Sequence, residues 1–285
     1  MAEVISGSAL ALQFKEKIAY KVQQLQQQGK PRPTLAVILV GNHPASVSYV
    51  KGKDKACKEV GFHSRMIHLA QDICEENLSE VIINLNNDDE VDGILLQMPL
   101  PKHLEPLRMI SLINPNKDVD GLHPINVGKL YLGLKGFKPC TPLGIIELLK
   151  SIHVDFTGLK AVVVGRSYLV GNPLSKLLQD LNCTVTICHS ATKNIKEICK
   201  TADILVVAIG KAQYVDASFV KEGAIVIDVG INKIDDHLVG DVCFEEVSKV
   251  CSYITPVPKG VGPMTIAMLL QNTLDSYYLA KGGIE

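Results

Sequence analysis

The sequence predicts an α/β protein of two domains, each built on a parallel sheet, with a cleft between them. Apolar runs of strand length alternate with segments of helix length. This alternation occurs once before and once after a stretch rich in Pro and Gly, Pro139–Gly144. Segments of that length supply the crossover connections that parallel strands require. The 285 residues also correspond to two domains of about 150 residues each.

The first alternation places three strands and two helices before the Pro- and Gly-rich stretch. The expected strands are Thr34–Val40, Ser64–Leu69 and Gly93–Leu96, and the expected helices run from about Ser46 to Gly61 and from Glu75 to Leu85. A final amphipathic helix is expected from about Pro263 to Ala280, because Pro suits the first turn of a helix. This helix should return to the first domain, which then comprises residues 1–140 and 263–285.

The second alternation is sharper and predicts a Rossmann-like nucleotide-binding domain over residues 141–262. The expected strands are Ala161–Val164, Thr184–Cys188, Ile204–Ile209 and Ala224–Val229, with helices at Asn172–Asp180 and Ile195–Lys200. The apolar runs have no polar alternation, which is typical of strands covered on both faces.

Composition excludes several classes of function. Lys and Arg number 29 against 30 Asp and Glu, a formal net charge of -1, so no global field attracts nucleic acid or an anionic membrane, and neither is an expected partner. No apolar run has the length of a transmembrane helix, and the N-terminus lacks a signal-peptide pattern. The eight cysteines form no CxxC pair and no cluster with His at metal-ligand spacing. We therefore expect no metal site, free thiols and a cytoplasmic location.

A glycine-containing loop, Gly165–Gly171, lies between a predicted strand and a predicted helix. Asn172 is the expected cap of that helix and Pro173 its first residue. A helix N-terminus in this position is where a dinucleotide pyrophosphate binds, because its free N–H groups and dipole favour an anion. Ser167 stands where the usual fingerprint has its second glycine. On this motif alone, a simple turn remains the alternative.

The end of the second strand of this domain favours NADP over NAD. An NAD site usually has Asp or Glu about 20 residues after the loop, whereas Cys188–Thr192 contains no carboxylate. Arg166 and the hydroxyls of Ser190 and Thr192 would instead suit a 2'-phosphate. The alternative is that Arg166 is solvated and Ser190 caps the following turn.

Six motifs occur in an order that resembles one enzyme family over essentially the whole chain. They are Tyr49–Lys53, Asp92–Pro101, Lys117–Gly121, Pro139–Pro142, Val164–Ser167 with Val170–Gly171, and Pro256–Pro258 with Gly260–Thr265. The chain resembles the bifunctional methylenetetrahydrofolate dehydrogenase/methenyltetrahydrofolate cyclohydrolase family. The resemblance implies NADP-dependent oxidation of 5,10-methylenetetrahydrofolate to the methenyl form, followed by hydrolysis to 10-formyltetrahydrofolate. It also implies that the first domain binds folate and that the enzyme is a homodimer.

The resemblance also assigns roles to individual residues. Lys53 matches the catalytic lysine and Tyr49, one helical turn earlier, its supporting tyrosine. Gln97 would contact both the lysine and the substrate, and Asp120 would bind the pteridine through two parallel hydrogen bonds. The remaining implied contacts are Pro263 for the substrate and Gly165, Arg166, Ser167, Ser190 and Ile231 for the cofactor.

Without the resemblance these assignments are weak. Lys53 is one of four lysines in a short helical segment, and a helical lysine is usually solvated. Lys259 departs from the family by replacing a glycine. If the position has a positive φ, Lys259 would introduce about 1 to 2 kcal/mol of backbone strain. Alternatively, its side chain would reach the folate glutamate tail or the cofactor phosphates. Two rival hypotheses are an NAD-linked dehydrogenase without cyclohydrolase activity and a catalytically silent folate or dinucleotide sensor.

Overall fold

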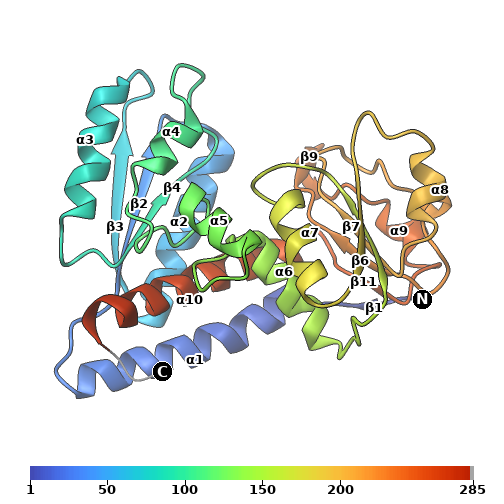
Figure 1. Ribbon diagram of the computed structural model, residues 1–285, viewed down its shortest axis with the longest axis horizontal. Coiled ribbons are helices and arrows are strands. Elements are labelled where there is room, and N and C mark those ends of the chain that lie inside the picture. Colours follow the sequence, from blue (N-terminus) through green and yellow to red (C-terminus); the bar gives the residue numbers. More distant parts are fainter. Residues whose placement is uncertain (283–285) are drawn as a thin grey trace. The chain divides into compact units, whose positions relative to one another are not determined.

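The computed structural model describes residues 1–282 and shows an α/β protein (Figure 1). The chain divides into two compact units. The six-stranded unit comprises Met1–Ala11 and Thr141–Thr265, and the three-stranded unit comprises Leu12–Cys140 and the segment from Ile266 onwards. Within residues 1–282, no helix is both long and apolar enough to cross a membrane.

The three-stranded unit is built on a parallel sheet with the strand order β3-β2-β4. Its elements are β2 (Thr34–Val40), α2 (Pro44–Val60), β3 (His63–Leu69), α3 (Glu75–Asn86), β4 (Gly93–Leu96), α4 (Pro106–Ser111) and α5 (Pro124–Tyr131). Every residue of the central strand β2 and of β4 is buried. The uninterrupted apolar runs follow from this burial, because helices cover the sheet.

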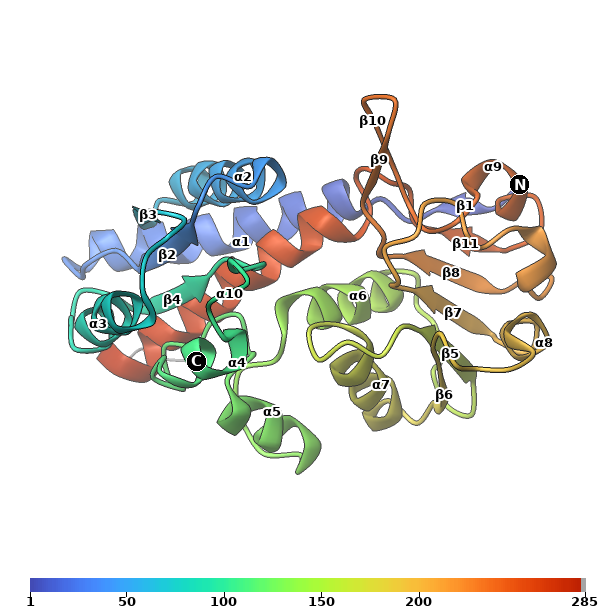
Figure 2. The ribbon, with the colours of Figure 1, turned by 90° about the horizontal axis from the view of Figure 1, so that it is seen from above.

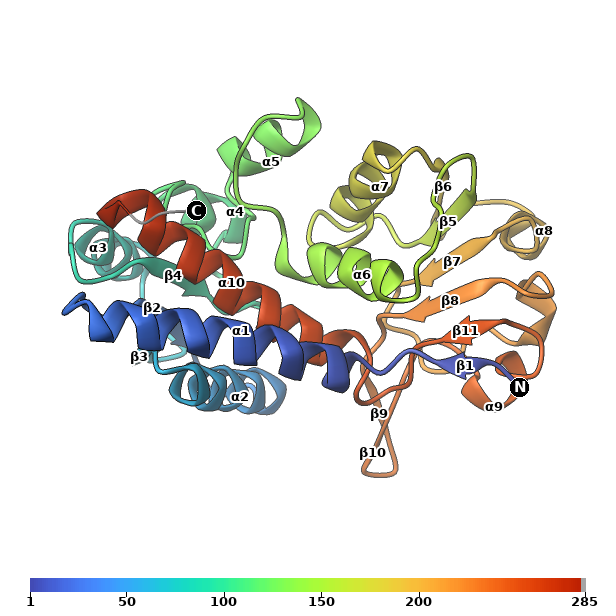
Figure 3. The same ribbon diagram turned by 90° about the horizontal axis from the view of Figure 1, so that it is seen from below.

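Two long helices begin in the six-stranded unit and continue into the three-stranded unit. They are α1 (Gly7–Gln27) and α10 (Val261–Lys281), which run alongside one another (Figure 1 and Figure 3). Asn272 of α10 donates from Nδ2 to the carbonyl oxygens of Val119 (2.9 Å) and Lys138 (3.1 Å). These bonds attach α10 to the loops that follow β4. The prediction assigned α10 to the first domain from Pro263, whereas the structure divides it after Thr265.

The six-stranded unit contains a wholly parallel sheet in the order β1-β11-β8-β7-β5-β6. Its strands are β1 (Glu3–Val4), β5 (Lys160–Val164), β6 (Thr184–Cys188), β7 (Ile204–Val207), β8 (Ile225–Asp228) and β11 (Tyr253–Ile254). Its other helices are α6 (Cys140–Ser151), α7 (Gly171–Asp180), α8 (Ile195–Cys199), the 3₁₀ turn η1 (Ala217–Phe219) and α9 (Phe244–Val247). The hairpin of β9 (Asn232–Ile234) and β10 (His237–Val239) projects from this unit (Figure 2 and Figure 3).

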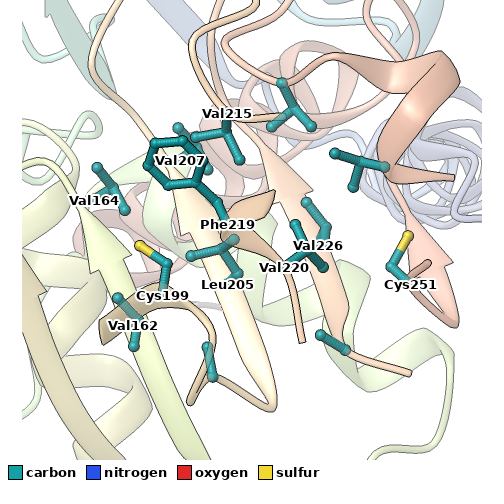
Figure 4. Packing of buried hydrophobic residues seen from close by; sticks show 14 of the residues in the cluster. Val162, Val164, Cys199, Leu205, Val207, Val215, Phe219, Val220, Val226 and Cys251 are labelled. Atoms are coloured by element: carbon teal, nitrogen blue, oxygen red, sulfur yellow. The ribbon is translucent and has the colours of Figure 1, made fainter. Parts of the chain in front are cut away.

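One apolar core fixes the positions of the central strands of this sheet. Phe219 lies among valine and leucine side chains from three adjacent strands, including Val207 of β7 and Val226 of β8 (Figure 4). Both valines are fully buried. Burial of apolar surface stabilises a fold by about 25 cal/mol per Å², so this core contributes strongly to holding the central strands together.

The structure corrects two predictions about the six-stranded unit. Residues Met1–Ala11 belong to it and not to the first domain, because β1 pairs with β11 and the Ile5 N–H donates to the Ile254 carbonyl (2.9 Å). Helix α7 begins at Gly171 with Val170 at the capping position, so Asn172 is not the cap.

Candidate active site

Helix α2 presents Tyr49 and Lys53 one turn apart on the same face. The helix ends at Gly61, whose φ of 81° is the left-handed conformation that glycine adopts readily. Lys53 is only 9% exposed, whereas the side chains of Lys55 and Lys58 are 79% and 70% exposed. Burial therefore distinguishes Lys53 from the other lysines of the helix, and Tyr49 is 38% exposed beside it.

Lys53 is held by Gln97, which follows directly after β4. The ammonium Nζ donates to Gln97 Oε1 at 2.7 Å. The other end of the amide, Nε2, donates to the Met98 carbonyl at 2.6 Å, which directs the oxygen to the lysine. The Gln97 N–H donates to the Ile38 carbonyl at 2.9 Å, so the sheet fixes the backbone of this residue.

Burial lowers the pKa of Lys53, because a charged ammonium loses hydration there. The neighbouring Asp120 carboxylate and, less strongly, the thiols of Cys140 and Cys57 oppose this change. A lysine with a lowered pKa exists as the neutral amine at lower pH than a solvated one. Lys53 can therefore accept and release a proton, which a surface lysine does poorly at neutral pH.

Asp120 lies in a tight turn that the preceding Asp118 stabilises. The Asp118 carboxylate accepts hydrogen bonds from the backbone of Leu122 (3.3 Å) and His123 (2.8 Å). Gly121 follows at a φ of 71°, and any Cβ there would overlap the backbone at Lys138 and Pro139. Burial raises the pKa of Asp120, while the charge of Lys53 lowers it.

Cys140 borders this group and was not among the predicted site residues. Its thiol donates to the Val119 carbonyl at 3.2 Å and accepts from Asn272 Nδ2 at 3.6 Å. Burial raises the pKa of Cys140 well above the usual range, so it remains a neutral thiol beside Asp120. Only its place in the Pro139–Pro142 motif could have indicated it.

The loop after β5 lies where the strand order of the six-stranded unit reverses, between β5 and β7. Ligands of open α/β sheets bind at this position. Gly165 has a φ of 130°, and a Cβ there would overlap the Ala208 carbonyl at the end of β7. A Cβ at Gly171 would overlap the Gly165 carbonyl. The two glycines allow this loop to pack closely against both its own helix and the neighbouring strand.

The middle of the loop has free donors. Arg166 and Ser167 are exposed, and within residues 1–282 no backbone hydrogen bond is donated by either N–H. Ser167 accepts from the Val170 N–H at Oγ (3.1 Å) and from the Asn172 N–H at its carbonyl (3.0 Å). The free N–H groups of Arg166 and Ser167, in the loop that leads into α7, therefore suit an anionic phosphate.

The other predicted cofactor residues lie after β6 and β8 of the same unit. Ser190 and Ile231 are exposed, Ile231 at 44%. Thr192 Oγ1 accepts from the His189 N–H (2.8 Å), so this hydroxyl shapes the turn. The structure thus groups Lys53, Gln97 and Asp120 in one unit and the predicted cofactor residues at the carboxyl edge of the other sheet. Among the described residues, no group of three or more His, Cys, Asp and Glu side chains could hold a metal ion.

Two residues of the C-terminal motif lie in the six-stranded unit. Pro263 is half-buried in the first turn of α10. Lys259 is exposed and has a φ of 81°, so the strained backbone that the sequence analysis considered is present.

Family models match both parts of the chain. Residues 5–120 match the tetrahydrofolate dehydrogenase/cyclohydrolase catalytic domain, and residues 139–281 match the NAD(P)-binding domain of the same enzymes. The chain belongs to the tetrahydrofolate dehydrogenase/cyclohydrolase family. It therefore combines a catalytic domain with an NAD(P)-binding domain, as the motifs predict.

Similar proteins of this family align over nearly the whole chain. The bifunctional protein FolD of Campylobacter concisus is 52% identical over 273 residues, which cover 95% of this chain and 96% of that protein. The crystal structure of FolD from Campylobacter jejuni has a TM-score of 0.95 at 49% identity, covering 97% and 98% of the two chains. A Trypanosoma brucei family structure, complexed with NADP cofactor and an inhibitor, has a TM-score of 0.95 at 37% identity and 99% coverage of both chains.

Proposed function

We propose that this chain catalyses two consecutive steps of tetrahydrofolate one-carbon interconversion. The first is oxidation of 5,10-methylenetetrahydrofolate to the methenyl cation, and the second is hydrolysis of that cation to 10-formyltetrahydrofolate. The observation that supports this most strongly is the buried contact of 2.7 Å between Lys53 Nζ and Gln97 Oε1 in a chain that also has an NAD(P)-binding domain. NADP supplies the hydride acceptor for the first step.

In the second step Lys53 acts as a proton acceptor. Addition of water to the methenyl carbon forms a C–O bond and releases one proton. Opening of the ring then breaks a C–N bond, as the hydroxyl loses its proton to become the formyl carbonyl and the departing nitrogen gains one. Neutral Lys53 is suited to accept the proton of the attacking water, because burial lowers its pKa. Gln97 positions the amine without adding a charge that would favour its protonated form.

The other residues of the three-stranded unit suit recognition of folate. Asp120 can accept two parallel hydrogen bonds from the 2-amino group and ring N–H of the pteridine, and the turn around Gly121 fixes its backbone. The half-exposed ring of Tyr49 provides an apolar face with a polar end. We also assign Pro263, which lies at the start of α10 in the six-stranded unit, to the substrate. The three-stranded unit is then the folate-binding domain.

The residues at the carboxyl edge of the six-stranded sheet suit NADP. Gly165, Arg166 and Ser167 combine a close-packed loop with free N–H donors and a guanidinium, while Ser190 and Ile231 lie exposed after neighbouring strands. The absence of Asp and Glu from 188–192 favours a 2'-phosphate over a free ribose hydroxyl. The alternative, an NAD-linked dehydrogenase without cyclohydrolase activity, has no comparable support in this sequence.

We further propose that the enzyme is a cytoplasmic homodimer acting on folate small molecules. All eight cysteines are free, as is usual for proteins of reducing compartments. Two-fold homodimers are the commonest oligomers of soluble proteins.

Two absorbance assays on one purified sample test the function. We expect reduction of NADP, and slower reduction of NAD, with methylenetetrahydrofolate. We also expect accelerated disappearance of methenyltetrahydrofolate in the absence of dinucleotide. Reduction of NAD alone with no methenyl hydrolysis would establish the alternative. A protein that binds folate or dinucleotide but catalyses neither reaction would establish the silent sensor.

A further inference from the structure

Two buried carboxylates lie near the carboxyl edge of the six-stranded sheet. Neither belongs to the residues predicted for the catalytic, substrate or cofactor sites. Asp228 is the last residue of β8 and is 4% exposed. Asp241 follows the β9–β10 hairpin and is fully buried. Buried carboxylates are costly to maintain and need hydrogen-bond donors.

Asp241 connects two loops through four hydrogen bonds. One oxygen, Oδ2, accepts from the N–H groups of Ile209 (2.7 Å) and Gly210 (2.9 Å). The other, Oδ1, accepts from the Lys211 N–H (2.8 Å) and from Asn232 Nδ2 (2.9 Å). Three consecutive N–H groups after β7 therefore converge on one side chain, which also holds the start of the hairpin.

Asp228 completes the arrangement from the other side. Its carboxylate accepts from the N–H groups of Gly230 (3.0 Å), Asp241 (2.9 Å) and Val242 (3.0 Å). Burial raises the pKa of Asp228 to about 7, and these three donors oppose the rise. The segment before the hairpin is thereby attached to the segment after it.

Two glycines make room for these carboxylates. A Cβ at Gly230 would overlap the Asp241 carboxylate, and a Cβ at Gly240 would overlap that of Asp228. Each glycine thus faces the acid of the opposite segment. Such reciprocal packing leaves the backbone of Gly230–Asn232 little freedom to move.

We propose that Asp241 is a positioning residue for the dinucleotide. It fixes the loop Ile209–Lys211 and the exposed Ile231 at the edge where the cofactor is expected, so that their backbones meet the bound ligand without reorganisation. This inference rests on the proposed function, because it assumes that the edge binds NADP. Asp241 acts through the loops and does not touch the reacting atoms.

Asp241→Asn tests the proposal, because an amide of the same shape leaves two N–H donors facing an NH₂ group. We expect NADPH to bind at least tenfold more weakly in a fluorescence titration, with a raised KM for NADP. Methenyl hydrolysis without dinucleotide should remain within twofold of the wild type. Asn232→Ala removes a single bond and should weaken NADPH binding about two- to fivefold, which keeps the test open if Asp241→Asn does not fold.

The matched control is Asp236→Asn, the same change in the turn of the adjacent hairpin. The Asp236 side chain is 91% exposed and its one ion pair within residues 1–282 is with Lys233 at 2.5 Å, so NADPH affinity should not change. Unchanged affinity in both Asp241→Asn and Asn232→Ala would overturn the proposal. An equal loss of binding and methenyl hydrolysis would also overturn it, because that indicates a general structural role. A wild-type protein that binds no NADPH would instead refute the proposed function.

Discussion

The contact between Lys53 and Gln97 allows the role of the lysine to be tested by a change of charge. Gln97→Glu would place a carboxylate oxygen about 2.7 Å from Lys53 Nζ, where the amide oxygen lies now. At an effective dielectric constant of about 20, two unit charges at this distance attract by about 6 kcal/mol. Burial of the new carboxylate cancels part of this energy. An opposite charge this close typically raises a lysine pKa by about 2 units.

The sign of the effect on the pH profile follows from the proposed mechanism. Burial lowers the pKa of Lys53, and the neutral amine accepts the proton. The rate of methenyl hydrolysis should therefore rise with pH as Lys53 loses its proton. In Gln97→Glu this rise should move to higher pH by about 2 units, so that hydrolysis is about 100-fold slower below both transitions. The two rates should converge at high pH.

Stopped-flow absorbance of methenyltetrahydrofolate over a range of pH measures this displacement. Gln97→Met is the control, since it removes the acceptor of the ammonium without adding a charge. Its transition should move to lower pH. An unchanged transition in Gln97→Glu, or the same displacement in both variants, would refute the assignment of the proton transfer to Lys53.

Two further predictions concern the six-stranded unit. Arg166→Ala should raise the KM for NADP at least tenfold and leave the KM for NAD unchanged. Equal effects on the two KM values would favour the NAD-linked alternative. Lys259→Gly should raise the free energy of unfolding by about 1 kcal/mol in urea, because the φ of 81° strains any residue with a Cβ. Lys259→Ala should give no such gain. Unchanged affinity of Lys259→Gly for polyglutamated folate would reject contact of Lys259 with the glutamate tail.

Elements with strong local signals were predicted from the sequence nearly residue by residue. Strand β2 has the predicted bounds Thr34–Val40, because its apolar run lies between Pro33 and Gly41. Strand β7 was expected to reach Ile209 but ends at Val207. The reason lies far away in the sequence, since the Ile209 N–H donates to Asp241 and leaves the ladder. Local patterns do not contain such a contact.

Other elements have no local signal strong enough to predict them. Strands β1 and β11 are two residues each, too short for a periodic pattern, and exist because they pair with one another and with β8. These strands depend on tertiary packing, which overrides local propensity. Helix α1 was also not predicted, although a local signal exists, because the Ser6 hydroxyl directly before it accepts from the Ala9 N–H at 3.3 Å, as a capping serine does.

The candidate site also depends partly on local sequence motifs and partly on long-range contacts. The ordered motifs identified Lys53, but only the structure shows that it is buried while Lys55 is exposed. Apart from the place of Cys140 in the Pro139–Pro142 motif, no sequence signal marks Cys140 or Asp241 as a site residue. Their environments arise from contacts with Asn272 and with Ile209, which are distant in the sequence.

The rate of methenyl hydrolysis in Lys53→Ala, compared with Lys55→Ala, tests the central claim most directly. Both lysines belong to α2, but the side chain of Lys55 is 79% exposed and its nearest carboxylate partner, Glu59, is 3.9 Å away. Both variants should have the far-ultraviolet circular dichroism of the wild type. We predict a loss of at least about 100-fold in Lys53→Ala, the usual size of a general-base contribution, and wild-type hydrolysis in Lys55→Ala. Full retention of methenyl hydrolysis in folded Lys53→Ala would contradict the account.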